Sequence, residues 1–207
     1  FSKVSIFSDL NNLTDLTMNP AATTLLGYTH EEVRKNYPVR LASLADRLVT
    51  DVDGAFAQLV SMYDGYCFDE RMVRVFNPVS LGSALRDTQL KSYWFETGTP
   101  AWLMTYAKKA PMDMDSLTVG DADLGTFEPA DPSMPAVLLQ TGYLTIKGVW
   151  GQGMGTVYDL GFPNEEVSAG FNRWLANAYV RPDTDVSQTS GWAIACHRAV
   201  GSGDVSG

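Results

Sequence analysis

A hairpin pattern around residue 150 limits the fold of this chain more than any other feature. Residues 143–150 (YLTIKGVW) and 156–162 (TVYDLGF) alternate apolar and polar side chains, and a Gly-rich GQGMG separates them. Alternation with a period of two is typical of strands with one buried face, and glycines supply the turn. GQGMG lacks the third glycine and the following helix of a dinucleotide-binding fingerprint. The sequence therefore predicts an antiparallel hairpin here.

Helical patterns flank the hairpin on both sides. The preceding SMPAVLLQ is a short apolar helix that should end near Gly142, since glycine favours helix C-termini. Asn164 is the predicted cap of the following helix. Its apolar face holds Val167, Phe171, Trp174, Leu175 and Ala178. Helix, hairpin, helix is the order expected in a winged-helix-like unit.

The first half of the chain predicts a bundle of amphipathic helices. Thr29 and Glu32 have the spacing of a capping box, and this helix should end before Pro38. Two amphipathic helices follow, with Thr50 and Asp51 between them as predicted caps. The apolar face of the first holds Leu41, Leu44, Ala45 and Leu48, and that of the second holds Val52, Phe56, Leu59, Val60 and Tyr63. Asn77 is a predicted cap with a proline at the first helical position. The predicted fold class is therefore α+β and mostly helical.

Two segments allow a binding or a structural interpretation. In residues 96–100 (ETGTP), Thr99 and Pro100 are typical of a helix start, and the glycines and lysine of a phosphate loop are missing. The amino end of that helix still makes Thr97, Gly98 and Thr99 candidates for facing an anion. Residues 111–132 are acidic and proline-rich without the calcium-loop spacing, which favours a solvated linker over a cation site.

Composition excludes several kinds of site. A formal charge of -9 argues against a nucleic-acid surface over the whole chain. Cys67, Cys196, His30 and His197 show no metal-ligand spacing, and no catalytic residue is predicted. No apolar run approaches the length of a membrane span, and the low cysteine content favours a cytoplasmic setting.

Seven strings in order carry a resemblance to a known family. They are FSKVSIFSDLNNLTDLT, LLGYTHEEV, MYDGYCF, VFNPVSL, YWFETGTPAWL, LLQTGYLTIK and LGFPNEEV, between Phe1 and Ala178. Together they resemble the bacterial AAA-type ATPase-like proteins that usually carry a C-terminal PD-(D/E)XK nuclease domain. The resemblance implies an ATPase core, a helical lid, a winged-helix connector and then the nuclease.

On this sequence the resemblance implies four segments. Residues 1–28 would be the tail of the P-loop ATPase core, 29–110 the helical lid, and 111–181 the acidic linker and winged-helix-like connector, with 182–207 unassigned. The chain has no GxxxxGK[ST] motif and no nuclease motif. We therefore expect an internal fragment that is not itself catalytic. ATP and Mg would bind the longer protein and neither would bind this chain alone.

The resemblance also suggests which residues lie near nucleotide and which partners matter. Ser8, Asn11, Asn12 and Asp15 follow the implied sensor strand, although capping and turn formation is the favoured explanation for them. The implied partners are the ATPase core and nuclease domains. A winged-helix nucleic-acid-binding module or a protein-interaction module is the alternative, and the five tryptophans make self-association a further alternative. Sparse basic charge beside Lys147 disfavours nucleic acid.

Overall fold

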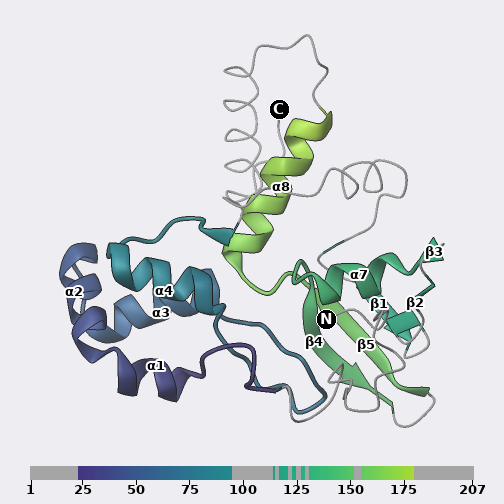
Figure 1. The fold of residues 1–207 in the computed structure, drawn as a ribbon, viewed down its shortest axis with the longest axis horizontal. Helices are drawn as coiled ribbons and strands as arrows, with labels where there is room; N and C mark the ends of the chain where they lie inside the picture. The colour runs from purple at the N-terminus through teal and green to yellow at the C-terminus, as the bar shows by residue number, and fades with distance from the viewer. Residues whose placement is uncertain are drawn as a thin grey trace, which may run out of the picture. The chain divides into compact units, whose positions relative to one another are not determined.

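A computed structural model gives the fold of this chain (Figure 1). The residues it describes are 23–94, 114, 117–120, 123–124, 127–128, 131–151 and 155–179. They fall into two compact units, one formed by residues up to Ser168 and the other by residues 169–179 of the last helix. Each unit is described by itself.

The described residues form an α+β structure in which helices account for about half, so the predicted class is confirmed. The helices are α1 (His30–Asn36), α2 (Pro38–Leu48), α3 (Val52–Tyr63), α4 (Pro78–Asp87), α7 (Met134–Gln140) and α8 (Glu165–Tyr179). The strands are β1 (Leu117–Gly120), β2 (Phe127–Glu128), β3 (Asp131–Pro132), β4 (Thr145–Trp150) and β5 (Val157–Gly161).

Helix α1 begins and ends where its sequence predicts. The Thr29 hydroxyl accepts from the Glu32 amide, and the Glu32 carboxylate accepts from the Thr29 amide at 2.8 Å, which completes the capping box. The helix stops before Pro38, whose ring cannot follow an α-helical residue without a clash. Pro38 then occupies the first turn of α2, where its missing N–H is harmless.

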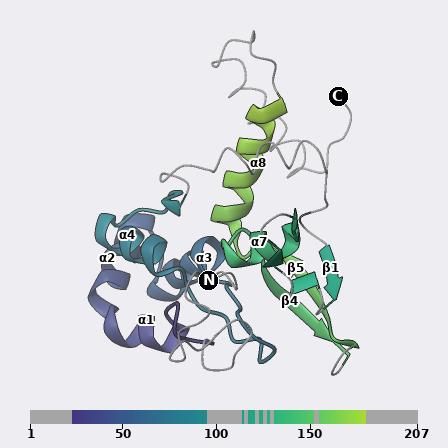
Figure 2. The same cartoon turned by 45° about the vertical axis from the view of Figure 1, so that its right-hand side comes forward.

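Helices α2, α3 and α4 pack around one apolar core, visible as a helical group in Figure 2. The Asp51 and Asn77 side chains cap α3 and α4. Apolar residues at helical spacing face inward because burying them removes apolar surface from water. The buried members of this core are Val33, Leu41, Leu44, Ala45, Ala55, Phe56, Leu59, Tyr63, Phe76, Leu81, Ala84, Leu85 and Tyr93.

A long loop of residues 64–77 connects α3 to α4. Its two arms form an isolated bridge between Tyr66 and Val75, and a second bridge joins Phe76 to Tyr28 ahead of α1. Gly65 follows α3 with a φ of +99°, in the positive-φ region that glycine favours. The loop is therefore held at its base by backbone hydrogen bonds.

The predicted hairpin is confirmed as strands β4 and β5, which pair antiparallel (Figure 2). Strand β1 adds to the other edge of β5 and gives the order β1-β5-β4. The sequence analysis placed β1 in an acidic linker, and that interpretation is wrong for these four residues. Leu117 lies opposite Leu160 and Val119 opposite Tyr158, so apolar cross-strand pairs recruit the segment to the sheet.

The helices around the hairpin also match their sequence signals. Helix α7 ends at Gln140 with Thr141 as its C-cap, and Gly142 follows with a φ of +81°. The Asn164 side chain accepts from the Val167 amide at 3.1 Å and caps α8. The order helix, hairpin, helix is therefore present. No helix in the described part of the chain is long and apolar enough to cross a membrane.

Candidate functional site

The predicted nucleotide-facing and anion-facing residues cannot be placed. Ser8, Asn11, Asn12 and Asp15, as well as Thr97, Gly98 and Thr99, all lie outside the described residues. Among the described residues, several buried polar groups lie where two segments contact their neighbours. Loop 64–77 contacts the sheet and the start of α8, and residues 93–94 contact the start of α8. We call this set of contacts the polar junction, and it comprises Asp64, Gly65, Cys67, Glu70, Tyr93, Trp94, Thr145, Tyr158, Pro163, Asn164 and Glu166.

At the centre of the polar junction is a hydroxyl group that makes two hydrogen bonds. Thr145 Oγ1, at the start of β4, accepts from the Cys67 amide at 2.6 Å and donates to the Cys67 carbonyl at 3.0 Å. Both residues are about 1% exposed. Because water cannot reach these backbone groups, the threonine hydroxyl satisfies what a neighbouring strand would otherwise satisfy. One side chain thus attaches the loop to the sheet.

A second set of contacts lies beside the first. The Asn164 side chain donates to the Asp64 carbonyl at 2.9 Å while it also caps α8. At the neighbouring position, a Cβ on Gly65 would lie 2.1 Å from the Pro163 carbonyl oxygen. Only glycine permits this close approach of two backbone segments. The Tyr158 hydroxyl adds a 3.0 Å bond to the Glu70 carboxylate.

A buried carboxylate completes the junction. Glu166, in the first turn of α8, is 1% exposed, and its Oε1 accepts from the Tyr93 amide at 2.5 Å and the Trp94 amide at 2.9 Å. Its Oε2 has no hydrogen-bond partner among the described residues. Two converging backbone amides therefore donate to one carboxylate oxygen. Glu166 therefore fixes the backbone directly before the ETGTP segment.

His30 and Asp64 form a dyad at the edge of the junction. His30 Nε2 lies 2.7 Å from Asp64 Oδ2, and the Asp64 side chain is 5% exposed while that of His30 is 46% exposed. The imidazole also packs against the rings of Phe56 and Phe76. A carboxylate behind a histidine orients the ring. No nucleophile lies in contact with this pair among the described residues, so the dyad orients His30 without a partner for acyl transfer.

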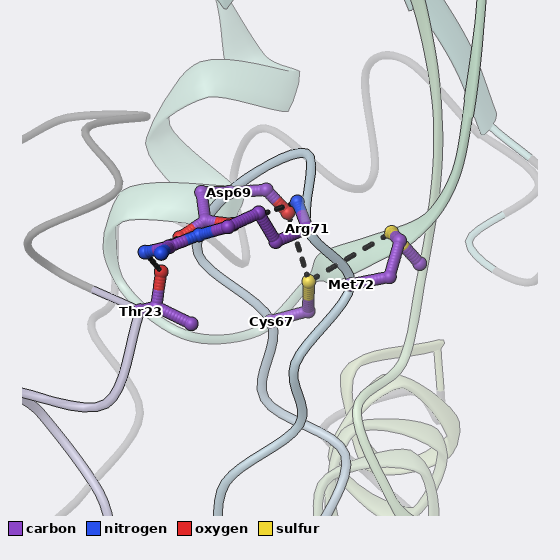
Figure 3. Close-up of polar contacts among 5 residues, drawn as sticks. All are labelled: Thr23, Cys67, Asp69, Arg71 and Met72. Carbon is purple, nitrogen blue, oxygen red and sulfur yellow. Dashed lines mark hydrogen bonds and ion pairs between the residues drawn. The ribbon is translucent and has the colours of Figure 1, made fainter.

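A third polar group fixes the tip of loop 64–77 (Figure 3). The Arg71 guanidinium contacts the Thr23 hydroxyl and lies 3.3 Å from Asp69 Oδ2, and the Arg71 amide donates to Asp69 Oδ1 at 2.7 Å. Asp69 is 2% exposed, so this pairing compensates the burial of its charge. The Cys67 thiol donates to the Asp69 carbonyl at 3.3 Å and lies 3.9 Å from Met72 Sδ.

The electrostatics of the site argue against nucleophilic chemistry. Burial raises the pKa of the Cys67 thiol above its ordinary value, which keeps it protonated and unreactive near neutral pH. No group of three or more His, Cys, Asp or Glu among the described residues could hold a metal ion. The arrangement is suited to holding two layers of secondary structure together.

Thr145, Glu166 and Cys67 were not predicted as site residues from the sequence. They nevertheless lie in three of the strings that carry the family resemblance, namely MYDGYCF, LLQTGYLTIK and LGFPNEEV. These strings are far apart in the chain and meet at the polar junction. What the sequence could not show was which polar residue of each string turns inward.

Comparisons with known proteins give little functional information. No protein-family model matches the chain, and no solved structure matches it. A curated relative, the "Uncharacterized protein in vnfD 5'region" of Azotobacter chroococcum mcd 1, is 34% identical over 194 residues. The match covers 92% of this chain and 35% of the relative. The chain thus spans about a third of the length of the relative that it matches.

Proposed function

We propose that this chain is the lid and connector portion of a AAA-type P-loop ATPase-like protein. In this proposal it responds to nucleotide bound by an ATPase core and couples ATP hydrolysis to a downstream nuclease domain. It is not itself catalytic, and it acts in the cytoplasm. Its proposed function is to connect the two domains and to transmit the movement of the ATPase core to the nuclease domain.

The observation that carries the proposal is the convergence of the family-like strings on the polar junction. MYDGYCF, YWF, LLQTGYLTIK and LGFPNEEV each supply at least one partner of a junction hydrogen bond. These bonds join the helical part to the sheet within one compact unit. The strings that carry the resemblance therefore coincide with the contacts that a mechanical coupling would need.

Energetics support a coupling role for these contacts. Removing one partner of a buried hydrogen bond costs about 1–3 kcal/mol, because the other partner stays desolvated. A displacement of the helices that broke several such bonds at once would be unfavourable by several times that amount. The helices and the sheet should accordingly move together. The relative's greater length leaves room for the proposed core and nuclease.

A winged-helix nucleic-acid-binding module is the alternative function. The order α7, β4, β5, α8 supports a winged-helix-like unit. The hairpin's charges do not favour phosphate binding, because the Lys147 ammonium donates to the Pro163 carbonyl at 3.2 Å and desolvation lowers the pKa of Lys147. The other charged side chain of β4 and β5 is the acidic Asp159. We therefore prefer the coupling function.

Calorimetry with MgATP tests the first half of the proposal. We expect no binding to this chain alone and binding to a longer protein that adds the proposed P-loop core. A longer protein that fails to bind MgATP would refute the ATPase assignment. Tight binding to the 207-residue chain by itself would refute the assignment of this chain as lid and connector.

Glu166→Ala in the longer protein tests the coupling. The substitution removes the acceptor of two buried amides. We therefore expect the variant to hydrolyse ATP as before, while ATP hydrolysis no longer stimulates the nuclease. Glu31→Ala is the matched control, since Glu31 is an exposed first-turn glutamate of α1. Equal effects of the two substitutions on the ratio of nuclease to ATPase activity would contradict the coupling role.

A further inference from the structure

An exposed tryptophan on the sheet is held in a fixed orientation. Trp150, at the end of β4, is 64% exposed, and its indole Nε1 donates to the Asp159 carboxylate of β5. The other oxygen of that carboxylate accepts from the Thr118 hydroxyl of β1 at 2.8 Å. All three strands therefore contribute to positioning one solvent-facing ring.

Gly148 makes this arrangement possible. It pairs with Asp159 across the strands, and a Cβ there would lie 3.2 Å from Asp159 Oδ2 and 3.3 Å from Trp150 Nε1. Both distances are tighter than ordinary carbon contacts, so a larger residue would press on the indole–carboxylate bond. The ring is consequently pre-organised, and a pre-organised side chain loses little entropy when it binds a partner.

Asp159 is the charged side chain that contacts the indole. Asp159 and Lys147 are the charged residues of the described strands β1, β4 and β5. The Lys147 ammonium is bound to the Pro163 carbonyl, which leaves Asp159 beside the indole. Hydrogen bonds from Trp150 and then Thr118 hold the pKa of Asp159 below its ordinary value, so it is ionised at neutral pH.

We propose that this face, formed by Trp150, Asp159, Thr118 and Gly148, binds an arginine side chain of a partner protein. The indole ring carries negative potential on its face, and tryptophan is the best aromatic partner for a cation. A guanidinium is flat and weakly hydrated, so it stacks on the ring and approaches the carboxylate edge-on. The chain's formal charge of -9 further attracts a basic segment. This inference is independent of the proposed ATPase association.

Calorimetric titration of the full 207-residue chain with hexa-arginine tests the proposal, with hexa-lysine as the comparison peptide, at about 0.15 M salt, where long-range attraction is screened. We expect hexa-arginine to bind more tightly than hexa-lysine. Trp150→Ala should weaken the binding of hexa-arginine about two- to fivefold. Val79→Ala, which trims another exposed apolar side chain, should leave the affinity unchanged.

The charge contribution has its own control. Asp159→Asn should weaken the binding of hexa-arginine more than Asp46→Asn does. The second substitution removes the same charge at an exposed position of α2. Equal weakening by the two substitutions would show non-specific attraction and overturn the proposal. So would wild-type affinity in Trp150→Ala, or binding of a single-stranded oligonucleotide in place of the peptide.

A spectroscopic measurement on the unaltered chain keeps the test independent of folding in the variants. The indole N–H resonance of Trp150 is assigned by its loss in Trp150→Phe. We expect it to shift on addition of hexa-arginine. An unmoved resonance at saturating peptide would mean that Trp150 only shields Gly148 and the strand backbone, and the proposal would fail. A shift that instead follows protein concentration would show self-association and refute it equally.

Discussion

The substitution Thr145→Val tests the polar junction at its centre. Valine has nearly the shape of threonine, so the change removes the hydroxyl and leaves the volume. The hydroxyl satisfies both the amide and the carbonyl of Cys67, at 2.6 and 3.0 Å. With both residues about 1% exposed, water cannot replace it. An orphaned buried donor costs about 1–3 kcal/mol, and the carbonyl adds less, so we expect a loss of about 2–4 kcal/mol.

Thr145→Ser is the matched comparison. It keeps the hydroxyl and deletes one buried methyl group, which costs about 1 kcal/mol. Thr141→Val removes a hydroxyl from an exposed threonine at the end of α7 and should change stability by less than about 0.5 kcal/mol. The three free energies of unfolding should therefore fall in the order Thr141→Val, Thr145→Ser, Thr145→Val, with the last the least stable.

Urea unfolding at pH 7 measures these free energies, and amide exchange gives a local check. The Cys67 amide should exchange with solvent faster in Thr145→Val than in Thr145→Ser, because only the former leaves it without an acceptor. Our reasoning would be refuted if Thr145→Val were as stable as Thr145→Ser with an unchanged urea slope. That result would mean that the Cys67 backbone finds another partner.

Three further predictions concern the helical part and the loop. Val49→Asn should stabilise the chain by about 0.5–1 kcal/mol in urea unfolding, because the valine is 93% exposed with a φ of +54°. Gly65→Ala should abolish the cooperative unfolding transition or sharply lower its urea midpoint, because the added Cβ would lie 2.1 Å from the Pro163 carbonyl oxygen. Gly82→Ala, on an open helix surface, should instead stabilise the chain. Backbone and then side-chain hydrogen bonds from Thr29 lower the pKa of Glu32, so the stability they contribute is present above its ordinary pKa and is lost as pH falls below it. Glu32→Gln should therefore reduce the difference in unfolding midpoint between pH 7 and pH 3.

Local signals determined the elements that the sequence analysis placed well. The Thr29 capping box, the Asn77–Pro78 helix start and the β4–β5 pairing each rest on contacts between residues close in the chain. Such contacts depend on the chain's own neighbours, so the sequence states them directly. The hairpin itself followed for the same reason, but its register did not, because the pairing shifts between Ile146 and Gly148.

Strand β1 shows where local signals fail. Its LTVG segment lies among acidic and proline residues that are typical of a linker, and β5 provides the apolar partners Leu160 and Tyr158. Strand propensity depends on cross-strand neighbours, which a single short segment does not contain. The strand therefore forms because another part of the chain offers an edge.

The sequence by itself determined the α+β class, the helix caps and the hairpin of this protein, because hydrogen bonds and apolar periodicity within short segments encode them. Only the tertiary structure decided that Thr145, Glu166 and Asn164 turn inward and bind loop 64–77 and residues 93–94. Each of these side chains has an ordinary local alternative, as a strand residue, a first-turn acid or a cap. Burial beside a distant unpaired backbone group gives them their second role, and that distance in sequence is why no local pattern could show it.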